Sequence, residues 1–225
     1  MRSSFPRLSV AAGAAALALV ACQSKPPTPP PSAVLDISSK TCGQVVNLET
    51  AEPLTPKKTQ KWVDIHTAVD ETSACVTSGG QSGNYVVYEL PEHATNHVIT
   101  VGGAKQKIRL LAPAVSMLDS NGELVRTFIA DKYQYIGGVF GVQLRPNEGE
   151  RYLLVKTDSD LVGNVEEVFE TRMVTQTGYA STPTGGASYT TYHGQENSTH
   201  RTFSHEGTVT IRVQALSGKI GAPAE

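Results

Sequence analysis

The sequence lacks an excess of positive charge and lacks an apolar run long enough to cross a membrane as a helix. Nineteen Lys and Arg stand against 21 Asp and Glu, a formal net charge of −2. Without Arg2 and Arg7, which lie in a leader described below, the balance is 17 − 21 = −4. Because binding to nucleic acid needs a basic surface, we expect no nucleic-acid partner. The N-terminal apolar run covers only residues 8–20, against the roughly 20 residues of a transmembrane helix.

Motifs of common enzymes and cofactor sites are absent or incomplete. The sequence contains no GxxxxGK[ST] phosphate-binding loop, and His205 begins an HExxH pattern that has no second histidine. Residues 80–84 lack the last glycine of GxSxG. Residues 158–163 begin like an EF-hand loop, but Val162 and Phe169 stand where oxygen ligands are needed, so we expect a turn. The sequence predicts no cofactor, no metal site and no enzymatic activity.

Two groups of polar residues still bear on chemistry. His193, His200 and His205 lie in or beside one polar segment, and a metal site there would require them to converge with a carboxylate. Solvated histidines are the simpler expectation. Asp64 and His66 are two residues apart, so they share one face of an expected strand, where we expect a hydrogen-bonded surface pair rather than a catalytic dyad.

The N-terminus has the three parts of a secretory signal. Arg2 and Arg7 precede the apolar run, which ends in Leu19-Val20-Ala21-Cys22. This tetrapeptide resembles the bacterial lipobox, in which the cysteine thiolate accepts diacylglycerol and becomes the mature N-terminus. We expect residues 1–21 to be a lipoprotein signal peptide and Cys22 the lipidation site. The alternative is an ordinary cleaved signal with an incidental cysteine. Residue 23, directly after the cysteine, is Gln rather than the Asp of an inner-membrane retention signal, which favours sorting to the outer membrane.

Residues 22–33 follow as a lipidated cysteine and a proline-rich tether. Five prolines between Lys25 and Ser32 favour polyproline II, which gives roughly 30 Å of semi-rigid chain. Such a spacer holds a domain away from a membrane surface.

Cysteine is scarce, with three in the chain. If Cys22 is lipidated, Cys42 and Cys75 remain, and an even pair in an oxidising compartment predicts a disulfide. No CxxC or Cys/His spacing suggests zinc or thiol exchange. The pair is expected to attach the irregular N-terminal segment to the rest of the domain.

Glycine and proline are abundant, 20 and 13 residues, and they separate short β-branched and aromatic runs. The clearest alternation is in residues 207–214, where Val209, Ile211 and Val213 are expected to point inward. Asn121-Gly122 predicts a hairpin turn of type I′. The expected strands are 85–90, 97–101, 107–111, 114–118, 123–129, 139–144, 151–157 and 207–214, with a weaker one at 61–66.

This spacing predicts an all-β protein, an antiparallel β-sandwich of jelly-roll or immunoglobulin-like type with an irregular N-terminal segment. We expect the sandwich to span residues 34–217 and residues 218–225 to be a flexible tail. Residues 161–168 are the single expected helix, weakened by Gly163. Residues 175–206 are expected to be a long polar loop, either functional or disordered.

Aromatic residues suggest a ligand site. Tyr179, Tyr189 and Tyr192 share the polar segment, and Trp62 is the only tryptophan. Flat rings beside amides and hydroxyls suit sugars, because the CH face of a sugar stacks on an aromatic ring and its hydroxyls bind polar groups. The alternative is that the tyrosines cover one end of the sandwich while Trp62 lies in the core.

Short motifs in the same order resemble the maltose operon periplasmic protein family (MalM). They are Tyr88-Glu89-Leu90-Pro91, LLAPAVSMLD at 110–119, Lys132-Tyr133-Gln134-Tyr135, Leu144-Arg145-Pro146, RYLLVKTDSDL at 151–161 and GTVTIRV at 207–213. The resemblance covers roughly residues 50–215. It implies a periplasmic protein without enzymatic activity that is encoded with maltose and maltodextrin uptake components. The lipobox and tether, and the lack of the helical C-terminal extension of longer members, depart from the family, and the resemblance transfers no functional residues.

The expected function is therefore a non-enzymatic outer-membrane lipoprotein, facing the periplasm, that assists carbohydrate uptake by contacting maltodextrin or a porin. The alternative is a structural or assembly lipoprotein that docks on an envelope protein complex through a sheet edge or through residues 175–206. A hydrolase would rest only on His, Ser and Asp residues that no motif assembles.

Overall fold

A computed structural model describes residues 32–223. The contacts divide the chain after Pro31, and the second part, Ser32–Glu225, contains every element described below. The expected signal peptide 1–21, the lipidation site Cys22 and nearly all of the tether 22–33 lie outside the described residues. Within residues 32–223, no helix has the length and apolar character needed to cross a membrane.

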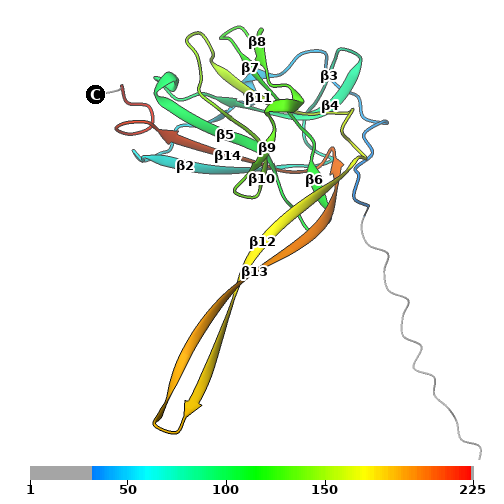
Figure 1. Cartoon of the computed structure of the whole chain (residues 1–225). Coiled ribbons are helices and arrows are strands. Elements are labelled where there is room, and N and C mark those ends of the chain that lie inside the picture. Colours follow the sequence, from blue (N-terminus) through cyan, green and yellow to red (C-terminus); the bar gives the residue numbers. More distant parts are fainter. Residues whose placement is uncertain (1–31, 224–225) are drawn as a thin grey trace, which may run out of the picture. The chain divides into compact units, whose positions relative to one another are not determined.

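The described chain is almost entirely β, and its strands form the expected sandwich (Figure 1). One sheet has the order β1 (Glu52–Pro53), β4 (Gln81–Glu89), β11 (Tyr152–Thr157), β7 (Pro113–Leu118) and β8 (Leu124–Thr127), with β3 (Cys75–Ser78) paired to β4. The second sheet has the order β2 (Trp62–Val69), β14 (Gly207–Ala215), β5 (His97–Ala104), β10 (Val139–Leu144) and β9 (Gln134–Ile136). A third sheet contains β12 (Val165–Thr182), β13 (Gly185–Ser204) and β6 (Arg109–Leu111). Three short 3₁₀ helices, Leu48–Thr50, Ala94–Asn96 and Ala130–Lys132, complete the elements.

The core lies between the first two sheets and follows the alternation of their strands. Val209, Ile211 and Val213 of β14 are buried, as the sequence predicts. They share one apolar cluster with side chains of the opposite sheet, among them Met117 and Leu153. Because every second residue of β14 points inward, the residues between them lie on the outer face of the five-stranded sheet, where they are exposed or half-buried.

The N-terminal segment of the described chain covers the outer face of the six-stranded sheet. The predicted Cys42–Cys75 disulfide is present and joins this segment to β3. Val46 and Leu48 pack against buried Tyr85 of β4. The Tyr85 hydroxyl accepts a hydrogen bond from the backbone N–H of Asn47 at 2.9 Å. The disulfide therefore attaches an irregular segment to the sandwich, as expected.

Two sequence predictions are wrong in the same region. Residues 161–168 are not a helix, because Gly163 has φ +89° and the chain turns there before it enters β12. Residues 175–206 are not a loop: β12 and β13 form a hairpin whose register joins Val165 to Thr202 and Thr182 to Gly185. The hairpin escaped prediction because it has no buried face, so its sequence lacks apolar alternation.

The base of this hairpin is anchored in a small apolar cluster. Phe203 is buried with Leu110 and Ala112, and its ring lies 5.3 Å from that of Phe140 on β10. Arg109 of β6 also forms an ion pair with Glu206. Beyond this base, nearly all side chains of residues 171–200 are exposed, and Figure 1 shows the β12–β13 ribbon extending away from the other strands.

The Asn121-Gly122 hairpin is confirmed between β7 and β8, but its turn differs from the predicted type I′. Only Gly122 has positive φ, +84°, whereas a type I′ turn needs positive φ at both central residues. Asp119 makes the turn instead, since its Oδ1 accepts the backbone N–H groups of Asn121 and Glu123 at 2.8 and 2.9 Å.

The expected flexible tail, residues 218–225, is wrong for the described residues 218–223. Ile220 is buried in the main core, and its N–H donates to the carbonyl of Gln60 at 2.9 Å. Gly221 donates its N–H to Nε2 of fully buried His97 at 3.3 Å. The Nδ1–H of the same ring lies 3.1 Å from the His93 carbonyl, which accepts it. A neutral His97 ring therefore holds the C-terminal segment.

This arrangement predicts loss of stability in acid. Burial lowers the pKa of His97 from its ordinary value of 6.5, and burial also lowers that of His205. The stabilisation by these two neutral histidines is complete above about pH 6.5. It is lost as the pH falls from there toward their lower pKa in the folded state, because the unfolded chain then binds protons that the folded chain does not. We therefore expect the thermal midpoint of unfolding to decrease when the pH is lowered from 7.5 to 5.

Replacing His97 by Gln should reduce the free energy of unfolding at pH 7.5 by about 1–3 kcal/mol and should flatten this pH dependence in part. The control is His66→Gln, which changes a histidine on the exposed face of β2. Equal pH profiles for His97→Gln and the unmodified chain would contradict the assignment.

Candidate functional site

The outer face of the five-stranded sheet carries a row of polar side chains. On β2, Trp62, Asp64 and His66 alternate with inward-pointing residues, so all three point outward. On β14, Thr210 and Arg212 lie directly opposite His66 and Asp64 in the register of the two strands. The sequence placed Asp64 and His66 on one face but could not identify these partners, which lie 144 and 148 residues away.

Asp64 and His66 do not form the expected pair with each other, because each binds β14. The guanidinium of Arg212 donates from Nε and from a terminal nitrogen to the two carboxylate oxygens of Asp64, at 2.7 and 2.9 Å. This double hydrogen bond lowers the pKa of Asp64 and raises that of Arg212. His66 Nδ1 lies 3.1 Å from the Thr210 hydroxyl. Asp64 and Arg212 therefore both stay charged at neutral pH. Three of the five N–H donors of the Arg212 guanidinium remain for other acceptors.

The same face continues across β5 and β10. Thr100 lies opposite Arg212, and Gln143 of β10 donates to the Thr100 hydroxyl at 3.3 Å. In the next row, Gly102 and Gly141 are direct partners of β5 and β10. A Cβ on either glycine would overlap the backbone of the facing strand, so β5 and β10 approach each other closely at this point.

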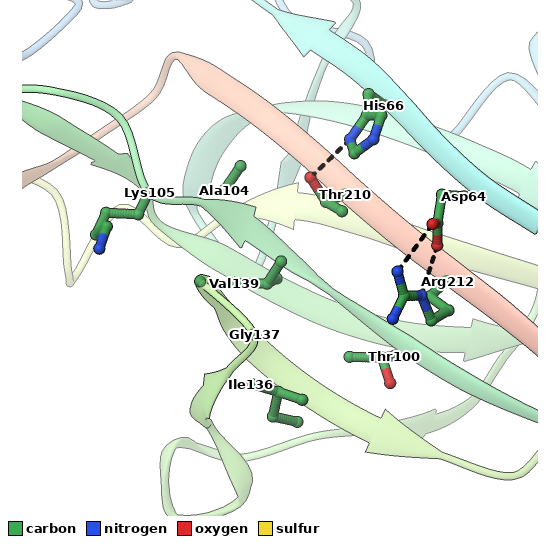
Figure 2. Close-up of a pocket in the computed structure, with 11 residues that line it drawn as sticks. Asp64, His66, Thr100, Ala104, Lys105, Ile136, Gly137, Val139, Thr210 and Arg212 are labelled. Carbon is green, nitrogen blue, oxygen red and sulfur yellow. Dashed lines mark hydrogen bonds and ion pairs between the residues drawn. The ribbon is translucent and has the colours of Figure 1, made fainter. Parts of the chain in front are cut away.

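A cavity of about 340 Å³ opens on this face, and its lining includes Thr100, Thr210 and Arg212 (Figure 2). Figure 2 shows Arg212 and Asp64 on one side and the turn between β9 and β10 on the other. Apolar Ile136 and Val139 line that second side. The cavity therefore offers hydrogen-bonding groups along one wall and aliphatic contacts along the other.

Trp62 lies at the end of this polar face, so the alternative that it sits in the core is wrong. Its side chain is 58% exposed. It stands opposite Gln214 of β14, two residues from Asp64 on the same face of β2. The sequence predicted aromatic rings beside amides and hydroxyls for sugar binding. Trp62 has the Gln214 amide opposite it, whereas the carboxylate and guanidinium nearby were not part of that prediction.

The three tyrosines do not join Trp62. Tyr179, Tyr189 and Tyr192 are 70%, 54% and 66% exposed, and all lie on the β12–β13 hairpin, which belongs to another sheet (Figure 1). Tyr179 lies over Gly186 and Tyr189 over Gly178 on the neighbouring strand. Tyr179 and Tyr189 therefore cover glycines of the hairpin, and all three tyrosines lie on the hairpin rather than over the end of the sandwich, so the predicted four-residue aromatic set is split.

The three histidines also stay apart. His205 is buried, with Nδ1 2.9 Å from the Thr157 hydroxyl, whereas His193 and His200 are exposed on β13. His193 and His200 are seven residues apart on one strand, about 23 Å, and they point to opposite faces. Within residues 32–223, no group of His, Cys, Asp and Glu side chains is placed to hold a metal ion.

Residues 158–163 form the expected turn. Asp158 Oδ1 accepts the N–H of Asp160 at 3.0 Å, and Gln81 donates to the Asp160 carboxylate at 2.6 Å. The carboxylates are thus bonded to groups of the protein in a turn that precedes β12.

No protein-family model, no curated protein and no solved structure matches the chain. The candidate site therefore rests on its own geometry, and the resemblance to the maltose operon periplasmic protein family remains a prediction from the sequence.

Proposed function

We propose that this protein is a non-enzymatic, glycan-binding lipoprotein of the bacterial envelope. The observation that carries the proposal is the outer face of β2 and β14, where exposed Trp62 stands beside the Asp64–Arg212 ion pair. A sugar ring can stack on the indole while its hydroxyls bind the carboxylate, the guanidinium and the Gln214 amide. The rigid sheet holds these groups in place without a ligand.

Binding without hydrolysis is supported by the acids present. Asp64 is the single carboxylate among the residues that line the described cavity. Glycoside hydrolysis in most families needs two carboxyl groups, one of them protonated. Arg212 lowers the pKa of Asp64, so this carboxyl group is a poor proton donor at neutral pH. The arrangement therefore supports recognition rather than cleavage.

Maltodextrin is the first ligand to test, because the strand motifs resemble the maltose operon periplasmic protein family. In this proposal Cys22 carries the lipid, the proline-rich residues 23–33 form the spacer, and the sandwich faces the periplasm at the outer membrane. The sequence features of residues 1–33 support this location.

The test is a titration of the purified full chain in detergent with maltodextrins. Trp62 is the only tryptophan, so its fluorescence reports on this face directly. We expect saturable binding, and we expect Trp62→Leu and Arg212→Gln each to weaken it about tenfold in calorimetry, equivalent to about 1.4 kcal/mol. The matched control is Tyr179→Leu on the hairpin, which should leave the affinity unchanged. Absence of binding at millimolar sugar, or unchanged affinity in Trp62→Leu, would refute the proposal.

A further inference from the structure

The β12–β13 hairpin has two unpaired edges. Among the described residues, β12 pairs with β13 alone, and β6 covers the other edge of β13 only at Thr202–Ser204. Free backbone N–H and C=O groups therefore run along β12 and along residues 185–201 of β13. Such edges form hydrogen bonds readily with another strand.

This hairpin lacks the usual protection against strand pairing. Residues 173–195 contain no Asp, Glu, Lys or Arg, and their only proline, Pro183, lies in the turn. The pairing of β12 with β13 runs from Val165 to Thr182 without a register shift, so no bulge twists the edge away. Two-stranded ribbons exposed on both faces are marginally stable in water, and further strands stabilise them. The hairpin is therefore suited to pairing with another strand.

The outward-pointing backbone N–H and C=O groups of the β12 edge can be matched with those of the β13 edge. The N–H of Thr202 points outward, to the carbonyl of Ile108 at 3.2 Å, whereas the N–H of Phe203 points back to Asn164 at 2.9 Å. By the alternation of antiparallel strands, even-numbered residues of β13 and odd-numbered residues of β12 present their backbone groups outward. The register within the chain joins just these two sets, for example Thr190 to Thr177. If β13 of one chain pairs with β12 of another chain in this same register, the outward backbone N–H groups therefore face outward C=O groups.

Charge complementarity favours a second copy of this chain as the occupant. Near the base, β12 carries Glu166 and Glu167, and the residues opposite them on β13 are Arg201 and His200. Arg201 lies beside β6, and its guanidinium donates to the Gln106 carbonyl, so pairing with a second copy starts at His200. In the same register, Glu167 of the second copy faces His200 of the first, and the uncharged residues 173–182 face the uncharged residues 185–194. Copies related in this way also point in the same direction, as chains anchored in one membrane surface do.

We propose that copies of this chain assemble side by side through their hairpins, with β13 of one copy paired antiparallel to β12 of the next in the register used within the chain. The interface is head-to-tail, so each copy keeps one free edge until the assembly closes into a ring or extends as a filament. This assembly is independent of glycan binding on β2 and β14.

The test is disulfide crosslinking between two full-length variants that are coexpressed with different tags. One carries Thr177→Cys and the other Thr190→Cys, so each chain has a single added cysteine and the new bond forms only between copies. We expect at least about fivefold more crosslinked dimer than from the control pair Thr177→Cys with Thr191→Cys, because Thr191 points to the opposite face of β13. A multimeric mass of the unmodified chain in detergent is the second expected result.

Three outcomes would overturn the proposal. Equal crosslinking of the two pairs would mean contact without this register. A monomeric mass with no crosslinked dimer would exclude assembly. Crosslinking of either cysteine to a different envelope protein in place of a second copy would assign the edge to that protein. Unchanged thermal midpoints of the three variants establish that their sandwiches are folded.

Discussion

Replacing both Cys42 and Cys75 by Ser is expected to lower the free energy of unfolding by about 3–4 kcal/mol. The disulfide spans a sequence separation of 33 residues, and closing a loop of this length removes that much chain entropy from the unfolded state. For a domain of this size the corresponding decrease in the thermal midpoint is roughly 10 °C. Denaturant unfolding at pH 7.5, before and after the substitutions, measures the effect.

The loss should begin in one region. The segment that contains Cys42 covers Tyr85 and Val87 on the outer face of β4 through Val46 and Leu48. Without the covalent link, we expect hydrogen exchange to increase first in residues 42–51, while the interior strand β14 remains protected. Reductant serves as the control: it should lower the midpoint of the unmodified chain and leave the double variant unchanged. A midpoint of the double variant equal to that of the oxidised protein would contradict the prediction.

The position of this disulfide connects stability to the proposed anchoring. Any force or motion transmitted from a lipidated Cys22 reaches the sandwich through the residues that precede Cys42. The disulfide joins that segment to β3, which pairs with β4 in the six-stranded sheet. The proposed glycan site lies on the other sheet, so the segment around Cys42 and that site are on opposite faces of the sandwich.

The strands that bury one face could be predicted from the sequence. Val209, Ile211 and Val213 alternate with polar residues, and this period of two identifies both the strand and its inner face. β14 is also an interior strand of its sheet, between β2 and β5, although the long hairpin separates it from β11 in the sequence. The cysteine pair was predictable too, because one even pair allows a single connection.

The hairpin could not be predicted from apolar alternation, since neither of its faces is buried. The sequence did carry one indication of the hairpin, which is β-strand propensity. Residues 165–182 are rich in Val and Thr, and Pro183 and Gly185 then mark a turn. A loop of some 30 residues was itself an argument against that assignment. Likewise, the sequence places Trp62 and Asp64 on one face of a strand, but their contact with β14 depends on pairing between distant segments.

A pair of glycines in β5 and β10 leads to the second large effect, which we expect for Gly141→Ala. Gly141 and Gly102 face each other across β10 and β5. A Cβ on Gly141 would overlap the backbone carbonyl of Val101, and one on Gly102 would overlap the carbonyl of Phe140. Because these obstacles are backbone atoms in the middle of a sheet, the strands must separate. We expect a loss of about 3 kcal/mol in the free energy of unfolding.

The matched control is Gly194→Ala in β13, where the nearest atom to the added Cβ is the Thr171 methyl group at 3.8 Å. This substitution should change the free energy of unfolding by less than about 1 kcal/mol. Gly141→Ala should also weaken glycan binding in the fraction that remains folded, because separating β5 from β10 displaces Thr100 and Val139, which line the cavity. Denaturant unfolding and calorimetry on the same preparations separate the two effects. Unfolding curves of Gly141→Ala and Gly194→Ala that coincide would show that the sheet accommodates a side chain at this position.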